Sequence, residues 1–169
     1  GTGGDYAAIQ VFELPTFEQV GEWHHNMTPM NQQVRILQGI NKHIHDSIIE
    51  KDSSASPQIF YSMENNTIGE AALMRVMDIG EENIMGMFLS EPIRKGHRRK
   101  FRRGFNTTAK HKIDACTKFK ELVEGGKMKI NSQLLISEMK DFVATGLSYK
   151  AKPGQHDDLV SSCLLMTRM

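Results

Sequence analysis

The apolar and polar positions of the first third of the chain change from a strand period to a helix period. Two runs rich in β-forming residues, Tyr6–Leu14 and Phe17–His25, flank the Pro15-Thr16 break and predict an antiparallel pair of strands. Thr28-Pro29 then begins a helix that extends to about Lys51, with Thr as cap and Pro at the first helical position. Its apolar stripe is Met30, Val34, Leu37, Ile40, Ile44 and Ile48.

A short apolar run, Gln58–Met63, follows a polar loop and precedes a second helix. An uninterrupted run of this length predicts a central strand that is buried on both faces. Asn65-Asn66-Thr67 caps the next helix, and Thr67 and Glu70 have the spacing of a capping box. The core stripe of that helix is Ile68, Ala72, Val76 and Ile79.

The rest of the chain continues to alternate strands with helices. The expected elements are a strand at Ile84–Leu89, a helix at Thr107–Glu124, a short strand at Lys127–Ile130, a helix from Asn131-Ser132 through Val143, an extended segment at Gly146–Lys150 and a last helix from the Asp157-Asp158 pair onward. Gly125-Gly126 and Pro153-Gly154 separate these elements. The order predicts an α/β fold with a mixed sheet flanked by helices.

Length and composition suit one globular domain spanning residues 1–169. The chain has 169 residues, 39% of them hydrophobic, and lacks the run of roughly 18 apolar residues that a membrane helix needs. We therefore expect a soluble protein, or a piece of one. Cys116 and Cys163 are far apart and predict buried thiols in a reducing compartment. The chain contains no phosphate-loop motif, so it does not encode nucleotide hydrolysis.

The net charge of +1 conceals a basic segment between Pro92 and Lys112. That segment contains no acid and nine of the 21 basic residues, which leaves twelve bases against 20 acids elsewhere. The nine are Arg94, Lys95, Arg98, Arg99, Lys100, Arg102, Arg103, Lys110 and Lys112. A basic loop on an otherwise acidic body is typical of phosphate-backbone binding, and a solvated charge run is the alternative.

Two sets of acids are candidates for metal chemistry. Glu64 follows the predicted buried strand directly, where open α/β sheets bind ligands. Asp157 and Asp158 precede the last helix, between His156 and an apolar run. When different secondary-structure elements bring such acids together, the acids can hold two hard ions such as Mg²⁺ or Mn²⁺ over a phosphate. The alternatives are a surface Glu in a loop and two acids that only start a helix.

Seven segments follow one another in a characteristic order: Asp5-Tyr6, Ser62–Gly69, Gly104–Lys112, Leu122–Ile130, Glu138–Phe142, Gly146–Tyr149 and His156–Val160. This ordered set resembles the nuclease domain of the large terminase subunit of T-even-like tailed bacteriophages. The resemblance implies a ribonuclease H-like fold and an endonuclease that cuts concatemeric viral DNA during packaging, using two Mg²⁺ or Mn²⁺ ions. It also implies double-stranded DNA, the portal protein and the small terminase subunit as partners, in the host cell cytoplasm.

The same resemblance assigns roles to individual acids. Glu64 matches the second catalytic acid of that family and Asp158 the third, so both are expected metal ligands. Asp157 and His156 are expected to orient or tune Asp158, and Asp157 to add to the metal set. Asp5 matches an acid near the catalytic site.

The chain departs from the family pattern at its beginning. The family's first catalytic Asp and the strand that carries it precede the glycine-rich turn in which this sequence starts. We therefore expect the first strand to be missing and the chain to be a fragment, with the ATPase domain also absent. Two alternatives stay open: a noncatalytic DNA-binding module, and a resolvase-like or integrase-like nuclease of the same fold.

Overall fold

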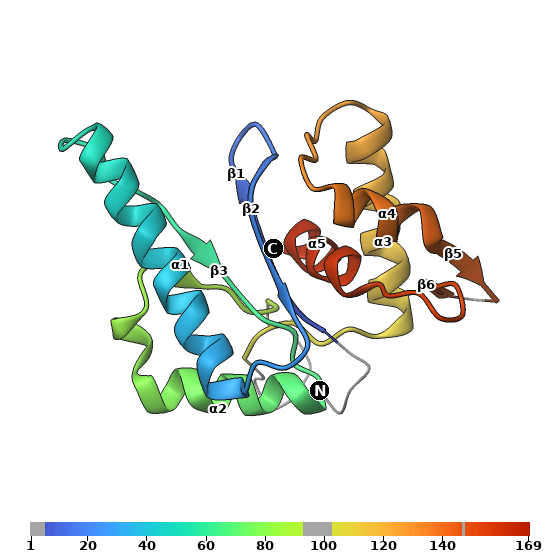
Figure 1. The fold of residues 1–169 in the computed structure, drawn as a ribbon, viewed down its shortest axis with the longest axis horizontal. Coiled ribbons are helices and arrows are strands. Elements are labelled where there is room, and N and C mark those ends of the chain that lie inside the picture. The colour runs from blue at the N-terminus through green and yellow to red at the C-terminus, as the bar shows by residue number, and fades with distance from the viewer. Residues whose placement is uncertain (1–5, 93–102, 147) are drawn as a thin grey trace. The chain divides into compact units, whose positions relative to one another are not determined.

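The computed structural model describes residues 6–92, 103–146 and 148–169, which form two compact units (Figure 1). We call residues 1–27 and 107–168 the Asp158 unit, and residues 28–106 with Met169 the Glu64 unit. Each unit is described by itself.

The Asp158 unit begins with an antiparallel hairpin. Strand β1 (Ala7–Glu13) pairs with β2 (Glu18–His25), and Ala8 lies opposite His24. This hairpin confirms the first predicted strand pair. Helix α5 packs against β1.

The Asp158 unit also contains three helices, and each begins where a polar residue precedes an apolar stripe. They are α3 (Ala109–Glu124), α4 (Gln133–Asp141) and α5 (Asp158–Arg168). The Thr108 and Ser132 side chains accept hydrogen bonds from the first turns of α3 and α4, as the capping preference of these residues predicts. Helix α3 ends at Glu124, directly before Gly125, as expected.

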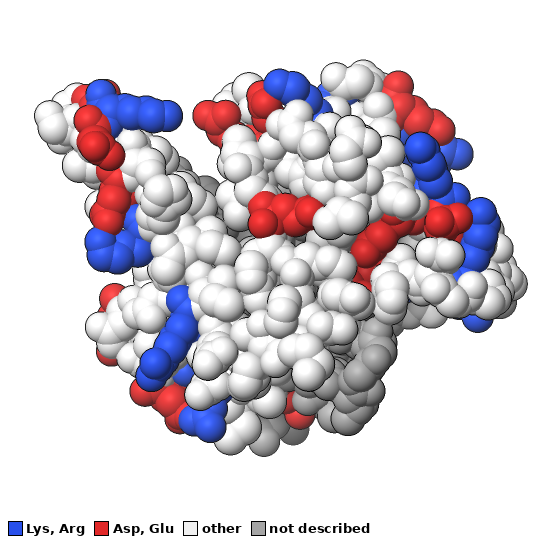
Figure 2. Space-filling model, in the orientation of Figure 1, with Lys and Arg blue, Asp and Glu red and all other residues white. Residues whose placement is uncertain are grey.

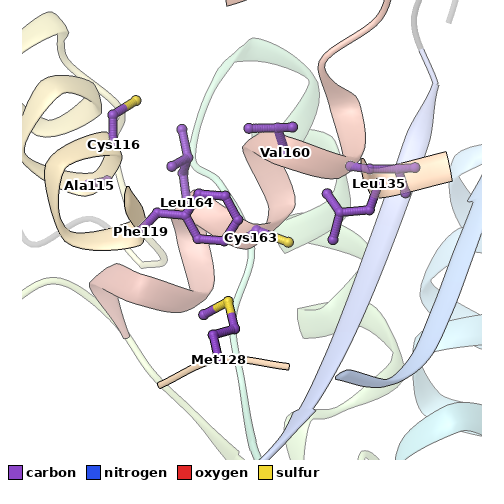
Figure 3. Packing of buried hydrophobic residues seen from close by; sticks show 9 residues of the cluster. Ala115, Cys116, Phe119, Met128, Leu135, Val160, Cys163 and Leu164 are labelled. Atoms are coloured by element: carbon purple, nitrogen blue, oxygen red, sulfur yellow. The ribbon is translucent and has the colours of Figure 1, made fainter. Parts of the chain in front are cut away.

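The core of this unit lies between α3, α4 and α5. Its buried members are Ala115, Cys116, Phe119, Met128, Leu135, Leu159, Val160, Cys163 and Leu164. Figure 3 shows Phe119 of α3 extending toward Leu164 and Cys163 of α5. Cys116 and Cys163 are both buried and both free thiols, which confirms the prediction of buried thiols. The apolar face of α5, which begins directly after Asp158, is therefore anchored in this core.

One predicted helix end and one predicted strand in the second half of the chain are wrong. Helix α4 ends at Asp141 rather than Val143, because the next residues form strand β5 (Phe142–Thr145) in a hairpin with β6 (Ser148–Ala151). Aromatic and β-branched residues favour such a strand. The segment Lys127–Ile130 does not form the predicted strand, and its one β-bridge joins Lys129 to Glu18.

The Glu64 unit consists of two helices and a small parallel sheet. Helix α1 (Met30–Lys51) packs on α2 (Thr67–Ile79), and β3 (Phe60–Tyr61) pairs with β4 (Met87–Phe88) after a short 3-10 turn at Glu81–Asn83. Its buried apolar cluster is Val34, Tyr61, Val76 and Ile84.

The strands of this unit are shorter than predicted. Only Phe60 and Tyr61 of the Gln58–Met63 run pair in a sheet. Tyr61 is buried, whereas Phe60 is 43% exposed. Because successive residues of a strand point to opposite faces, the expectation of burial on both faces is wrong at Phe60. Helix α1 also begins at Met30, with Pro29 rather than Thr28 in the cap position.

The antiparallel and parallel pairings, together with the helices, confirm a mixed α/β fold. Within the described residues, the strands form three separate two-stranded sheets rather than the single mixed sheet predicted from the sequence. Among the described residues, no helix is both long enough and apolar enough to cross a membrane.

Candidate metal centre

Three potential metal ligands from different elements of the Asp158 unit converge at the start of α5. They are His24 at the end of β2, Glu138 in α4 and Asp158 in the first turn of α5. One ligand atom of each lies within 4.8 Å of the ligand atoms of the other two. An imidazole nitrogen and two carboxylate oxygens suit a divalent ion, which also offsets the mutual repulsion of the acids.

The cluster adjoins a pocket of about 180 Å³ in the same unit. Tyr6, His24, Glu138 and His156 line this pocket, together with residues of α4 and of the turn that precedes α5. The ring of Tyr6 stacks on the His24 imidazole, with a centroid separation of 4.2 Å, and meets the His156 ring edge-on at 4.9 Å. Nδ1 of His156 lies 3.8 Å from a carboxylate oxygen of Asp158.

Glu138 connects α4 to the N-terminus of α5. Its Oε2 accepts hydrogen bonds from the backbone N–H groups of Leu159 (2.9 Å) and Val160 (3.2 Å). These are donors of a first helical turn, which have no partner within the helix. Burial raises the pKa of the Glu138 carboxyl group. The two backbone hydrogen bonds lower this pKa, whereas the nearby Asp158 and Asp157 raise it further. Glu138 therefore fixes the helix start from which Asp158 projects.

The His24 imidazole is partly buried, and its Nε2 is a buried atom without a hydrogen-bond partner among the described residues. The pKa of His24 is lowered, chiefly by burial and also by the nearby His156 and His25, against the attraction of Asp158 and Glu22. The neutral imidazole, the form that binds metal, is thereby favoured.

A buried glutamine holds β2 against the start of α4. The Oε1 atom of Gln19 accepts hydrogen bonds from the backbone N–H groups of Asn131 and Ser132, both at 2.9 Å. Its Nε2 donates to Gln10 (2.7 Å) and Glu22 (3.2 Å). Because Gln19 and His24 share β2, and Glu138 follows in α4, this network helps to set the position of His24 relative to Glu138.

Asp157 faces a different set of groups from those around Asp158. Its carboxylate lies 3.7 Å from Nζ of Lys112 and accepts a 3.3 Å hydrogen bond from the Ala151 backbone. Lys112 also lies over the Phe142 ring, 5.4 Å from its centroid. Asp157 is not part of the three-residue cluster, and its contacts link the start of α5 to α3 and β6.

Glu64 lies in the other unit, in the loop that follows β3, and two residues separate it from the strand's end. Its position forms a parallel bridge with Phe105, and the Asn65 backbone N–H donates to the Phe105 carbonyl at 2.7 Å. Asn66 donates to Glu64 Oε2 at 2.9 Å and accepts from the Gly69 backbone N–H at 2.7 Å. The residue that caps α2 thus also orients the Glu64 carboxylate.

The structure describes only some of the predicted DNA-binding residues. Arg94, Lys95, Arg98, Arg99, Lys100 and Arg102 lie outside the described residues, as does Asp5. Arg103 pairs with Glu81 and lies 5.2 Å from the centre of the Phe88 ring. Figure 2 shows Lys and Arg interspersed with Asp and Glu over the described residues of the face in view.

Sequence reasoning found Asp158 but assigned no role to His24 or Glu138. More than a hundred positions separate His24 from Glu138 in the sequence, so no sequence spacing relates the three residues. Glu138 begins one of the segments on which the terminase resemblance depends, which was the one available signal.

Comparisons with known proteins agree on the fold. The family model of the terminase RNaseH-like domain matches residues 1–169. Crystal structures of the large terminase nuclease from the thermophilic phage G20c are similar at 18% identity: the magnesium-bound form has a TM-score of 0.64, and the cobalt-bound form 0.63. Each match covers 98% of this chain and 75% of the G20c chain.

Proposed function

The chain belongs to the terminase RNaseH-like domain family, and on this premise we propose that it is a metal-dependent endodeoxyribonuclease that cuts concatemeric viral DNA during genome packaging. The observation that supports this proposal most strongly is the cluster of His24, Glu138 and Asp158. Carboxylates and an imidazole gathered at one helix start fit a divalent ion, and related folds are crystallised with magnesium or cobalt.

The reaction that we propose is two-metal hydrolysis of a phosphodiester bond. Two Mg²⁺ or Mn²⁺ ions, once bound, would activate water and stabilise the leaving oxygen. Asp158 and Glu64 are the acids that we assign as metal ligands. Asp157, through Lys112 and the Ala151 backbone, holds the start of α5 in place. Asp5 is assigned to the surroundings of the site.

Double-stranded DNA is the proposed substrate. The basic residues of the 94–112 segment, Lys112 included, are assigned to its phosphate backbone, since clustered Lys and Arg bind phosphates without regard to sequence. By family membership, the portal protein and the small terminase subunit are the proposed partners, and the host cell cytoplasm is the proposed location.

Cleavage of supercoiled plasmid in Mg²⁺ or Mn²⁺ tests the proposal. Because the match covers 75% of the G20c chain, the assay compares this chain with a longer form that spans the full length of the G20c nuclease. Glu64→Gln and Asp158→Asn are expected to lower cutting by about a hundredfold or more. Loss of a residue that only hydrogen-bonds a metal ligand already costs about 10- to 100-fold in activity, and loss of a ligand should cost at least as much.

The matched controls remove exposed acids from neighbouring elements. Glu70→Gln in α2 and Asp114→Asn in α3 are expected to leave cutting unchanged. If Glu64→Gln or Asp158→Asn cuts like the parent, the assignment is wrong. If neither form cuts but both bind DNA with a steep salt dependence and no response to Mg²⁺, the DNA-binding module replaces the nuclease.

A further inference from the structure

The unusual member of the cluster at the start of α5 is the His24 imidazole. The Tyr6 ring stacks on it, with an angle of 22° between the planes, and limits its rotation. Its Nε2 is buried without a hydrogen-bond partner among the described residues, which is costly for a polar atom unless something binds there. The next residue, His25, is exposed, and its Nδ1 accepts a hydrogen bond from the Met27 backbone.

The two carboxylates beside His24 are linked through the start of α5. Both backbone hydrogen bonds of Glu138 go to Oε2, so Oε1 is the oxygen that remains for an ion. Asp158 belongs to the helix whose first N–H groups Glu138 binds. The two acids therefore keep a fixed separation, and His24 adds a nitrogen within 4.8 Å of both.

The identity of these ligands decides which ions they prefer. Mg²⁺ takes oxygen ligands in a strict octahedron and retains several waters. Imidazole suits transition metals such as Co²⁺ and Zn²⁺, and affinity for a mixed nitrogen and oxygen site rises from Mn²⁺ to Co²⁺. A site with one imidazole and two carboxylates is therefore expected to bind such ions more tightly than Mg²⁺.

We propose that His24, Glu138 and Asp158 form a binding site for a single divalent transition-metal ion, with His24 as the ligand that favours this ion over Mg²⁺. The inference extends the proposed function, because Asp158 is common to both. It requires neither Glu64 nor DNA cutting, since all three ligands lie in the Asp158 unit.

Binding of Mn²⁺ to the 169-residue chain tests the inference directly. Electron paramagnetic resonance measures free and bound Mn²⁺ during a titration, and pulsed measurements detect a nitrogen nucleus bonded to the ion. We expect the bound ion to show one imidazole nitrogen whose coupling changes when the histidines carry ¹⁵N. We also expect Mg²⁺ to displace Mn²⁺ only at an excess of about tenfold or more.

The variants His24→Ala and His25→Ala form a matched pair. His24→Ala is expected to abolish the nitrogen coupling and weaken Mn²⁺ binding by about tenfold or more, whereas Mg²⁺ binding changes little. His25→Ala is expected to retain both signals, because that ring is exposed and faces Met27.

Bound Mn²⁺ without nitrogen coupling in the parent chain would overturn the inference, whatever the folding of the variants. So would coupling that survives His24→Ala or disappears in His25→Ala. Loss of plasmid cutting in Glu64→Gln, with the nitrogen coupling intact, would support both the nuclease and this site. Intact coupling without any cutting would refute the nuclease alone.

Discussion

Gly69 lies where α2 turns closest to the loop that carries Glu64. A Cβ atom at this position would lie 2.8 Å from the carbonyl carbon of Glu64, still closer to its oxygen, and 3.2 Å from Oδ1 of Asn66. The first of these distances is shorter than real Cβ contacts, so Gly69→Ala must displace backbone. The Gly69 N–H is also the donor that Asn66 caps at 2.7 Å.

The expected loss of stability follows from opposing effects. Alanine in place of a helical glycine favours the helix by up to about 1 kcal/mol. Steric overlap in a packed region costs about 1–3 kcal/mol, and disruption of an N-cap adds about 1 kcal/mol. We therefore expect Gly69→Ala to lower the free energy of unfolding by about 1–3 kcal/mol and to displace Glu64.

Gly39 in α1 provides the control, because a Cβ atom there meets nothing within 4 Å. Gly39→Ala is expected to raise the free energy of unfolding by up to about 1 kcal/mol. Urea unfolding followed by far-ultraviolet circular dichroism measures both variants, and the plasmid assay compares their cutting. A Gly69→Ala variant as stable as Gly39→Ala would refute the proposed packing of α2 against the Glu64 carbonyl.

Two further predictions concern the core of the Asp158 unit. Leu135→Ala, at a fully buried position, is expected to cost about 2–5 kcal/mol in urea unfolding, whereas Leu134→Ala, at a position 60% exposed, is expected to cost about 0.5 kcal/mol or less; similar losses would contradict the assigned face of α4. Burial raises the pKa of the Cys116 and Cys163 thiols, which keeps them protonated at neutral pH. In the folded chain both thiols should therefore react slowly with an aromatic disulfide reagent, and in the unfolded chain both should react quickly. Rapid absorbance change in the folded state would show that these thiols are accessible.

Local patterns were sufficient to predict most elements. The β1–β2 hairpin follows from two runs of β-forming residues around a proline break, and α3 begins and ends at residues with strong capping preferences. The errors occurred where pairing with a distant segment decides the outcome. Phe142 and Val143 fit a helical stripe as well as a strand, and only their pairing with Ala151 and Lys150 makes them β5.

The same distinction separates the two parts of the candidate site. The sequence by itself determined that acids follow a short strand at Glu64 and begin the last helix at Asp158, because helix starts and strand ends have local signatures. Only the tertiary structure brought His24 and Glu138 to Asp158 and turned Asp157 toward Lys112. Helix α4 and strand β2 meet through the buried Gln19, and the directions in which side chains converge depend on such packing rather than on spacing along the chain.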